Sequence, residues 1–311
     1  MSVRIGTRGS PLALAQAHAV AAALRAVEAE VEIVPMKTEG DRRFGARLAD
    51  VGGKGLFVRE IEEALLRGRV DVAVHSLKDL PAQLADGLEL AAFPPREDPR
   101  DVLVTSTGET LQGLPEGAVI GTSSLRRRAM ILAARPDLTV APIRGNVDTR
   151  LAKLAAGEFD GVVLAAAGLR RLGLAPVQAI PLDVETFVPA VGQGILAVEV
   201  RRDDADTRRL VAQLDHADTH VCARAERAYL GRLGASCNTP MAAHAVLERS
   251  DQRARLRMTA VVASQDGRRI LRADAGGAPA DAEKVGRGLA ELLLERGAEA
   301  IAALHPTREP R

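Results

Sequence analysis

The chain has 311 residues, 47% of them hydrophobic and 27% charged, and its formal net charge is +1. This length allows two or three domains with separate cores, and the near-neutral charge argues against a nonspecific nucleic-acid binder. Five Phe, one Tyr and no Trp leave few rings on which bases could stack. Two cysteines without a CxxC pattern indicate neither a disulfide framework nor a zinc finger.

The first residues enter a strand directly, without a signal-type leader, and no apolar run is long enough to cross a bilayer. We therefore expect a cytoplasmic protein with no membrane and no nucleic-acid partner. An anionic ligand of such a protein must be held by a local cluster of cations, because the surface as a whole is not basic.

The first part of the chain predicts an α/β unit. Residues 3–5 read as a short strand and residues 12–27 as an Ala-rich helix with Pro11 at a favoured early position. The turn between them carries Arg8 and Ser10. The further expected elements are a strand at 31–36, a mobile Gly-rich loop at 41–55, a helix at 56–67 and a buried strand at 70–74.

The buried strand at 70–74 is followed by Ser76, Lys78 and Asp79. Open α/β sheets bind ligands at the C-terminal ends of their strands, so this turn is a candidate site. Asp79 is either a helix cap or a partly desolvated acid whose pKa depends on burial and nearby cations. The residues alone leave both interpretations open.

Two strand–turn–helix units, at 118–128 and 138–150, predict an anion site. Backbone N–H groups at a helix start lack internal partners and attract anions, and Arg pairs with carboxylate or phosphate in a two-pronged manner. The polar and basic side chains of these turns are Ser123, Ser124, Arg126, Arg127, Arg144 and Arg150. One such turn is usually a solvated helix start, but their repetition favours a shared site. The spacing does not separate carboxylates from phosphates.

Segments rich in proline, glycine and charge at 93–100 and 188–195 predict two crossings between domains. Between them, a strand at 159–164 leads into a helix with Arg170 and Arg171. The later expected elements are a helix at 207–233, a hairpin of 255–263 and 268–275, and an amphipathic helix at 281–304. We expect three domains, made of residues 1–95 with 194–212, residues 100–189, and residues 217–311.

Several other patterns are weak. His216, His220 and Cys222 have a spacing that could hold a metal, but neighbouring aspartates favour a solvated helix start, so we predict no metal. Residues 52–55 lack the spacing and the following Ser or Thr of a P-loop. Ser124 lacks the GxSxG elbow of a serine hydrolase. Cys237, in its small polar loop, is either a buried hydrophobe or a nucleophilic attachment point, and the spacing alone favours the buried hydrophobe.

Several stretches together resemble the porphobilinogen deaminase, or hydroxymethylbilane synthase, family over essentially the whole chain. The matching stretches are residues 7–14, 51–57, 75–81, 96–101, 121–127, 144–151 and 189–194. The resemblance implies an α/β fold whose first two domains are like type II periplasmic-binding-protein lobes, with mixed five-stranded sheets and flanking helices. From the order of the expected elements we predict a small α+β third domain, and we expect a monomer.

The resemblance also implies the chemistry. Members join four porphobilinogen units head to tail, releasing ammonia each time, into hydroxymethylbilane on a dipyrromethane cofactor. Here Cys237 would hold that cofactor by a thioether, and Asp79 would assist loss of the amino group and steady the pyrrole cation. The loop at 41–55 would be a lid. Cofactor or substrate binding would fall on Arg8, Ser10, Lys54, Phe57, Ser76, Lys78, Thr122, Ser123, Ser124, Arg126, Arg127, Arg144, Gly145, Asn146, Arg150, Arg171 and Gln193.

Two positions depart from the family pattern. Asp50 stands where some members have lysine, and Ala235 and Ser236 stand where many members have two glycines directly before the cysteine. The alternative function is a two-lobed protein that clamps a polyanion without catalysis. The missing export sequence and the presence of Asp79 and Cys237 argue against it.

Overall fold

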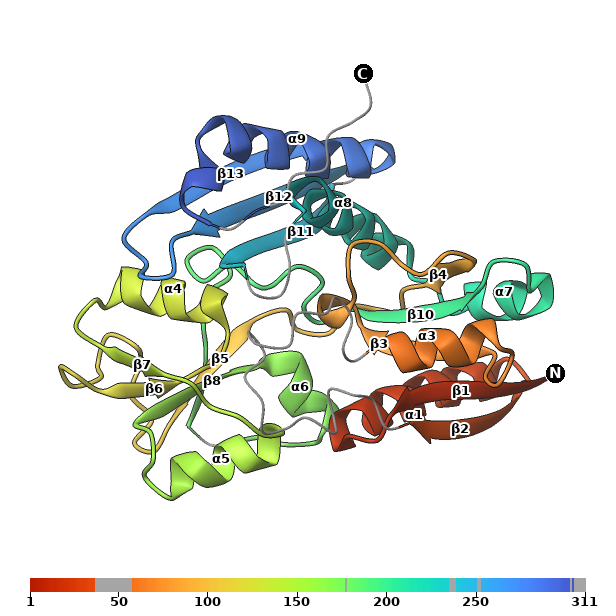
Figure 1. The fold of residues 1–311 in the computed structure, drawn as a ribbon, viewed down its shortest axis with the longest axis horizontal. Helices are drawn as coiled ribbons and strands as arrows, with labels where there is room; N and C mark the ends of the chain where they lie inside the picture. The colour runs from red at the N-terminus through yellow and green to blue at the C-terminus, as the bar shows by residue number, and fades with distance from the viewer. Residues whose placement is uncertain (37–57, 177, 235–238, 251–252, 303, 305–311) are drawn as a thin grey trace. The chain divides into compact units, whose positions relative to one another are not determined.

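The computed structural model describes residues 1–36, 58–176, 178–234, 239–250, 253–302 and 304 (Figure 1). It forms two compact units: unit 1 comprises Met1–Glu97 and Ile195–His220, and unit 2 comprises Asp98–Gly194 and Val221–Arg311. Within the described ranges, no helix has the length and apolarity that a membrane crossing requires. The expected three-domain boundaries stay a prediction.

Unit 1 is built on a mixed five-stranded sheet with the order β2-β1-β3-β10-β4. Strand β1 pairs in parallel with β2 and β3, whereas β10 is antiparallel to β3 and β4. Its elements are β1 (Ser2–Arg8), α1 (Pro11–Ala26), β2 (Glu30–Met36), α3 (Arg59–Leu66), β3 (Val72–Ser76), the 3-10 helix η1 (Leu77–Asp79), β4 (Leu88–Ala92), β10 (Leu196–Arg201) and α7 (Ala205–Ala212).

Alternation along β3 places helices on both faces of this sheet. Val72 and Val74 join the core that α1 covers, and Ala73 joins the core that α3 covers. Helix α1 begins where the Ser10 side chain accepts a hydrogen bond from the Ala13 N–H, with Pro11 in the first turn. This is the covered, mixed sheet of an α/β fold.

Unit 2 contains a second mixed five-stranded sheet, with the order β7-β6-β8-β5-β9. Strand β6 is parallel to β7 and β8, and β5 is antiparallel to β8 and β9. Its elements are β5 (Asp101–Thr105), β6 (Val119–Gly121), α4 (Leu125–Ala134), β7 (Thr139–Ala141), α5 (Val147–Ala155), β8 (Gly161–Ala165), α6 (Ala166–Arg171) and β9 (Ala179–Pro181).

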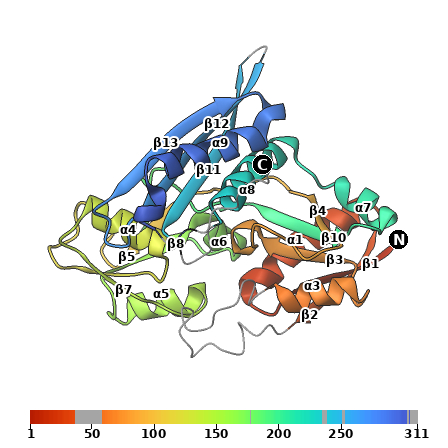
Figure 2. The same ribbon diagram turned by 45° about the horizontal axis from the view of Figure 1, so that its top comes forward.

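A three-stranded antiparallel sheet, β11-β12-β13, completes unit 2. Its elements are α8 (Ala217–Leu233), β11 (Met241–Ser250), β12 (Arg253–Ala263), β13 (Ile270–Gly277), α9 (Ala282–Glu295) and the 3-10 helices η2 (Pro279–Asp281) and η3 (Ala298–Ala300). Figure 2 shows α9 lying along β12 and β13. The fold class expected from the sequence, two mixed five-stranded sheets and a small α+β part, is confirmed.

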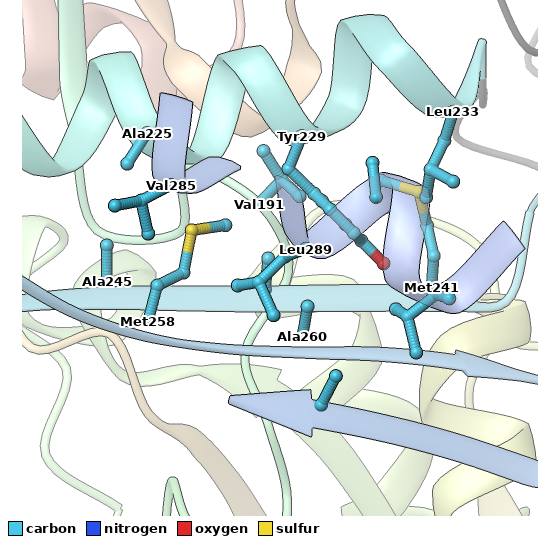
Figure 3. Packing of buried hydrophobic residues seen from close by; sticks show 14 of the residues in the cluster. Val191, Ala225, Tyr229, Leu233, Met241, Ala245, Met258, Ala260, Val285 and Leu289 are labelled. Atoms are coloured by element: carbon cyan, nitrogen blue, oxygen red, sulfur yellow. The ribbon is translucent and has the colours of Figure 1, made fainter. Parts of the chain in front are cut away.

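Helices α8 and α9 pack on the β11-β12-β13 sheet, and Tyr229 lies in the core between them. This side chain is fully buried and donates a hydrogen bond from its hydroxyl to the Val261 carbonyl at 3.2 Å. Figure 3 shows it between α8 and the strand that carries Ala260. Gly286 of α9 lies so close to α8 that a Cβ there would stand 2.0 Å from the Ala225 carbonyl oxygen. Only glycine permits this backbone approach.

Three predicted boundaries are wrong. The single helix expected at 207–233 is two helices, α7 and α8, because residues 213–216 turn the chain and His216 accepts a hydrogen bond from the Thr219 N–H. The helix expected at 281–304 ends as α9 at Glu295, since Gly297 adopts a left-handed φ of 88°. Strand β11 lies inside a region for which no strand is predicted.

Candidate active site

A small pocket in unit 1 lies where β1 and β3 end. Its volume is about 60 Å³. Four predicted site residues line it together, namely Arg8, Ser10, Ser76 and Asp79. Gln16 of α1 also lines it and donates from Nε2 to Ser76 Oγ at 2.7 Å, which fixes α1 to the end of β3.

Asp79 is the last residue of η1, and its side chain is exposed. No side chain caps η1, so the helix-cap interpretation of Asp79 has no counterpart in this structure. Lys78 lies half-buried in the same short helix. An exposed carboxylate at a pocket that also contains a guanidinium can meet a cationic group of a ligand while Arg8 meets an anionic one.

One wall of the pocket contains a buried contact between a histidine and a glutamate that sequence reasoning missed. His75 lines the pocket, and its Nε2 lies 3.0 Å from Oε2 of Glu199 on β10. The two side chains are 5% and 0% exposed. Burial, together with the charge of Glu199, raises the pKa of Glu62 on α3. A glutamate inside the apolar strand at 196–200 was the available signal.

In unit 2, the first predicted anion turn is the N-terminus of α4. The Ser124 side chain accepts from the Arg127 N–H at 3.4 Å, and Thr122 Oγ1 accepts from the Ser124 N–H at 3.2 Å. Ser123 donates from its hydroxyl to the Ile143 carbonyl at 2.7 Å. These three side chains therefore stabilise the turn and link it to the segment that begins the second turn.

The two arginines of this turn meet at one carboxylate. Asp101, at the start of β5, is fully buried, and its Oδ1 accepts from Arg127 Nε at 3.0 Å and Arg127 Nη2 at 2.7 Å. Its Oδ2 forms an ion pair with Arg126 Nη1 at 2.7 Å. Gln193 donates from Nε2 to the same Asp101 Oδ1 at 3.0 Å. Burial alone would raise the pKa of Asp101, but the charges of Arg126 and Arg127 outweigh it and lower that pKa.

The second predicted turn has a different construction. Gly145 has φ +111°, and a Cβ there would stand 2.6 Å from Thr149 Cβ. Its carbonyl accepts a hydrogen bond from Arg150 Nε at 2.9 Å. Burial and the charge of Arg127 lower the pKa of Arg150, so Arg150 shares the electrostatic surroundings of the first turn. Asn146 occupies the N-cap position of α5 without a side-chain cap bond, and Arg144 is half-buried beside it.

The crossing segment at 188–194 is fixed to these turns. Arg126 Nη1 donates to the Val188 carbonyl at 2.8 Å, and Arg171 Nη2 donates to the Gly194 carbonyl at 2.7 Å. Gly192 N–H is bound by the buried carboxylate of Glu226 on α8. The segment predicted as a crossing therefore packs against the group formed by Arg126, Arg127 and Asp101, the arginine cluster.

Some predicted residues lie elsewhere. Lys54, Phe57, Cys237, Asp50 and the lid at 41–55 fall outside the described residues. The histidines considered for a metal make local contacts: His216 Nδ1 lies 3.0 Å from Thr219 Oγ1, and His220 Nδ1 lies 2.8 Å from Asp215 Oδ2. In the described ranges no group of three His, Cys, Asp or Glu side chains could hold a metal ion.

Two models of one protein family together match most of the chain. Residues 3–209 match the family model described as porphobilinogen deaminase, dipyromethane cofactor binding domain, and residues 220–295 match the porphobilinogen deaminase C-terminal domain. The class is that of a tetrapyrrole-forming transferase. The chain belongs to the porphobilinogen deaminase family.

Two curated relatives have the same length as this chain to within a few per cent. The porphobilinogen deaminase of Syntrophobacter fumaroxidans is 49% identical over 301 residues, covering 96% of both chains. That of Syntrophotalea carbinolica is 50% identical over 312 residues, covering 99% of this chain and 98% of the relative. Among solved structures, a putative methionine-binding lipoprotein of Bacillus subtilis is 13% identical with a TM-score of 0.43, over 68% of this chain and 89% of that chain.

Proposed function

We propose that this chain joins four porphobilinogen molecules head to tail into hydroxymethylbilane, with loss of ammonia at each step, on a dipyrromethane primer bound to Cys237 by a thioether. Membership of the porphobilinogen deaminase family supports the reaction. The structural observation that carries the proposal is the excess of buried guanidinium over carboxylate in unit 2. The family match gives no support to the alternative of a polyanion-binding protein without catalysis.

The arginine cluster fits the groups that it would bind. Each pyrrole of substrate or cofactor has an acetate and a propionate side chain, so a growing chain needs several fixed cations. Arg126 is only 5% exposed. Its Nε has no hydrogen-bond partner in the described part of the chain. A buried donor without a partner is costly, and a ligand carboxylate would satisfy it.

In unit 1 we assign the chemistry to Asp79. Loss of ammonia breaks the bond between the aminomethyl carbon and nitrogen of porphobilinogen and leaves a positive charge shared with the pyrrole ring. The exposed carboxylate of Asp79 would stabilise that charge and assist departure of the amino group. The dipyrromethane cofactor, when bound, supplies the pyrrole carbon to which the first unit is joined.

We assign substrate carboxylates in unit 1 to Arg8 and Lys78, with Ser10 and Ser76 as hydrogen-bond donors. Arg8 and both serines line the same pocket as Asp79. In unit 2 we assign cofactor and substrate carboxylates to Arg126, Arg127 and Arg150. The remaining assignments of the same kind are to Lys54, Phe57, Thr122, Ser123, Ser124, Arg144, Gly145, Asn146, Arg171 and Gln193.

The proposal is tested by the intact mass of the purified chain and of Cys237→Ser, with Cys222→Ser as the matched control. Extra mass equal to two linked pyrrole units is expected in the wild type and in Cys222→Ser, and not in Cys237→Ser. Porphobilinogen added to the wild type should release ammonia, and no release would overturn the assigned reaction. We also propose a cytoplasmic monomer, which size-exclusion chromatography with light scattering checks for its oligomeric part.

A further inference from the structure

The arginine cluster of unit 2 has an unequal count of buried charges. The side chains of Arg126 and Arg127 are 6% and 8% exposed, and that of Asp101 is 0% exposed. In the described part of the chain Asp101 is the one carboxylate within ion-pair distance of either guanidinium. One negative charge therefore faces two fixed positive charges and neutralises only one of them.

The other bonds of these arginines supply geometry but no charge. Arg127 Nη1 donates to the Val163 carbonyl of β8 at 2.7 Å, and Arg126 Nη1 donates to the Val188 carbonyl at 2.8 Å. Carbonyl oxygens orient a guanidinium group but do not cancel its charge. One positive charge thus stays buried without a counter-ion among the residues that the structure describes, which is costly in a medium of low dielectric constant.

A second, independent feature points to an anionic ligand. Arg126 Nε is buried and has no hydrogen-bond partner among the described residues, although the neighbouring Nη1 of the same group has two acceptors within 2.8 Å. Burial and the charge of Arg127 also lower the pKa of Arg126. The guanidinium is held on one side by Asp101 and left with an unsatisfied donor, as expected for a group that completes its contacts with a ligand.

We propose that Asp101 is the positioning residue of this cluster: it fixes both guanidinium groups in place while neutralising one of them, and so leaves the folded unit with a demand for one carboxylate from a ligand. The inference rests on the proposed function in taking that ligand to be an acetate or propionate arm. It adds a role for a residue that does not itself touch the ligand.

Gln193 supports the same role. Its Nε2 donates to Asp101 Oδ1 at 3.0 Å and to the Pro99 carbonyl at 2.7 Å. The amide therefore holds the Asp101 carboxylate in one orientation without adding charge. Asp101, Gln193 and the two arginines come from three separate segments, and the carboxylate is the group that all of them share.

The experiment uses citrate, a small tricarboxylate, to test how many uncompensated positive charges the cluster holds. The full-length Cys237→Ser chain serves as the parent, so that a tethered primer does not occupy the cluster. The melting temperature is measured as citrate is raised at constant ionic strength, for the parent, Asp101→Asn and Arg127→Gln. Asp137→Asn is the matched control, because Asp137 pairs with Arg135 in the same unit but its side chain is 29% exposed.

Anion binding to the folded state raises the melting temperature, and at a given concentration a tighter-binding anion raises it more. Asp101→Asn keeps an oxygen acceptor for Arg127 but leaves two uncompensated guanidinium groups, so we expect a lower melting temperature without citrate and a larger rise with citrate than in the parent. Arg127→Gln leaves a neutral pair, so its rise should be smaller than that of the parent. Asp137→Asn should follow the parent.

An equal or smaller rise in Asp101→Asn than in the parent would overturn the proposal, because a merely structural carboxylate lowers all melting temperatures by one amount. If Asp101→Asn does not fold even in citrate, Arg127→Gln decides, and a rise equal to that of the parent overturns the inference. Failure of the proposed function is seen separately, as absence of ammonia release from porphobilinogen by the wild-type chain.

Discussion

His75 Nε2 and Glu199 Oε2 lie 3.0 Å apart on the neighbouring strands β3 and β10, in one wall of the unit 1 pocket. The strand register pairs His75 with Ala197, so Glu199 is the diagonal neighbour on the same face of the sheet. Both side chains are almost fully excluded from water. Each group therefore depends on the other for compensation of its polarity.

Removal of Glu199 should strongly destabilise the fold. Glu199→Ala leaves the buried imidazole without its hydrogen-bond partner, and we expect the free energy of unfolding to fall by about 1–3 kcal/mol. Urea denaturation followed by circular dichroism measures this loss. The control is Glu63→Ala, which breaks the exposed pair of Glu63 with Arg67 on α3. Its loss should stay within about 0.5 kcal/mol, and equal losses in the two variants would contradict the argument.

The pH dependence of stability should report the charge of Asp101. The pKa of Asp101 is lowered in the folded state, so its ionised form contributes stability that is complete above the unfolded value, about 4. That contribution is lost as pH falls through the lowered, folded-state pKa. The difference in unfolding free energy between the wild type and Asp101→Asn should be constant above about pH 5 and shrink below about pH 4.

Urea titrations of both proteins between about pH 3 and 7 measure this difference. Asp71, Asp98 and Asp204 also have lowered pKa values, because arginine partners and backbone N–H groups outweigh the burial that alone would raise them. They are present in both proteins, so their contributions cancel in the difference. A difference that stays constant down to the lowest pH would mean that Asp101 is not held as a carboxylate by the two arginines.

Replacement of the assigned acid should reduce catalysis without changing the fold. Asp79 is exposed in η1, so Asp79→Asn should leave the melting temperature unchanged. General acid–base assistance is worth about 10²–10⁴-fold in rate, and ammonia release should fall by that order. Asp86→Asn is the control, since Asp86 is an exposed aspartate of the same unit outside the pocket lining. Wild-type rates in Asp79→Asn would remove Asp79 from the chemistry.

The parts of the fold that the sequence predicts correctly are those whose signals are local. The starts of α1 and α4 are fixed by Ser10 and Ser124, each of which accepts a hydrogen bond from a backbone N–H three residues later. The break between α7 and α8 is different. There Asp215 accepts from the backbone N–H of Phe93, a partner 122 positions away, and no helical periodicity reveals such a contact.

The same distinction applies to the candidate sites. The turns of Arg126 and Arg150 stand out in sequence because strand, polar turn and helix follow one another. Their counter-ion Asp101 does not stand out in the sequence. It lies 26 positions from Arg127, in a stretch whose one signal is the family resemblance. Glu199 lies 124 positions from His75. Pairs at such separations are formed by sheet topology, which composition and periodicity do not specify.

The backbone of the second turn should tolerate no side chain at Gly145. Its φ of +111° lies outside the conformations that L-residues adopt readily, and a Cβ would meet Thr149 Cβ and Cγ2 at 2.6 Å. Gly145→Ala should therefore lower the free energy of unfolding by more than about 2 kcal/mol. It should also weaken the citrate response, because the Gly145 carbonyl orients Arg150 through its Nε.

Gly157→Ala is the control that separates the cost of a positive φ from the cost of a steric clash. Gly157 has φ +75°, and no atom lies within 4 Å of the position that a Cβ would occupy. The cost of a left-handed conformation alone is about 1–2 kcal/mol, and the citrate response should stay that of the parent. Urea denaturation and citrate melting curves of both variants measure the two effects. Similar losses in both, with an unchanged citrate response, would show that Gly145 does not hold Arg150 for ligand binding.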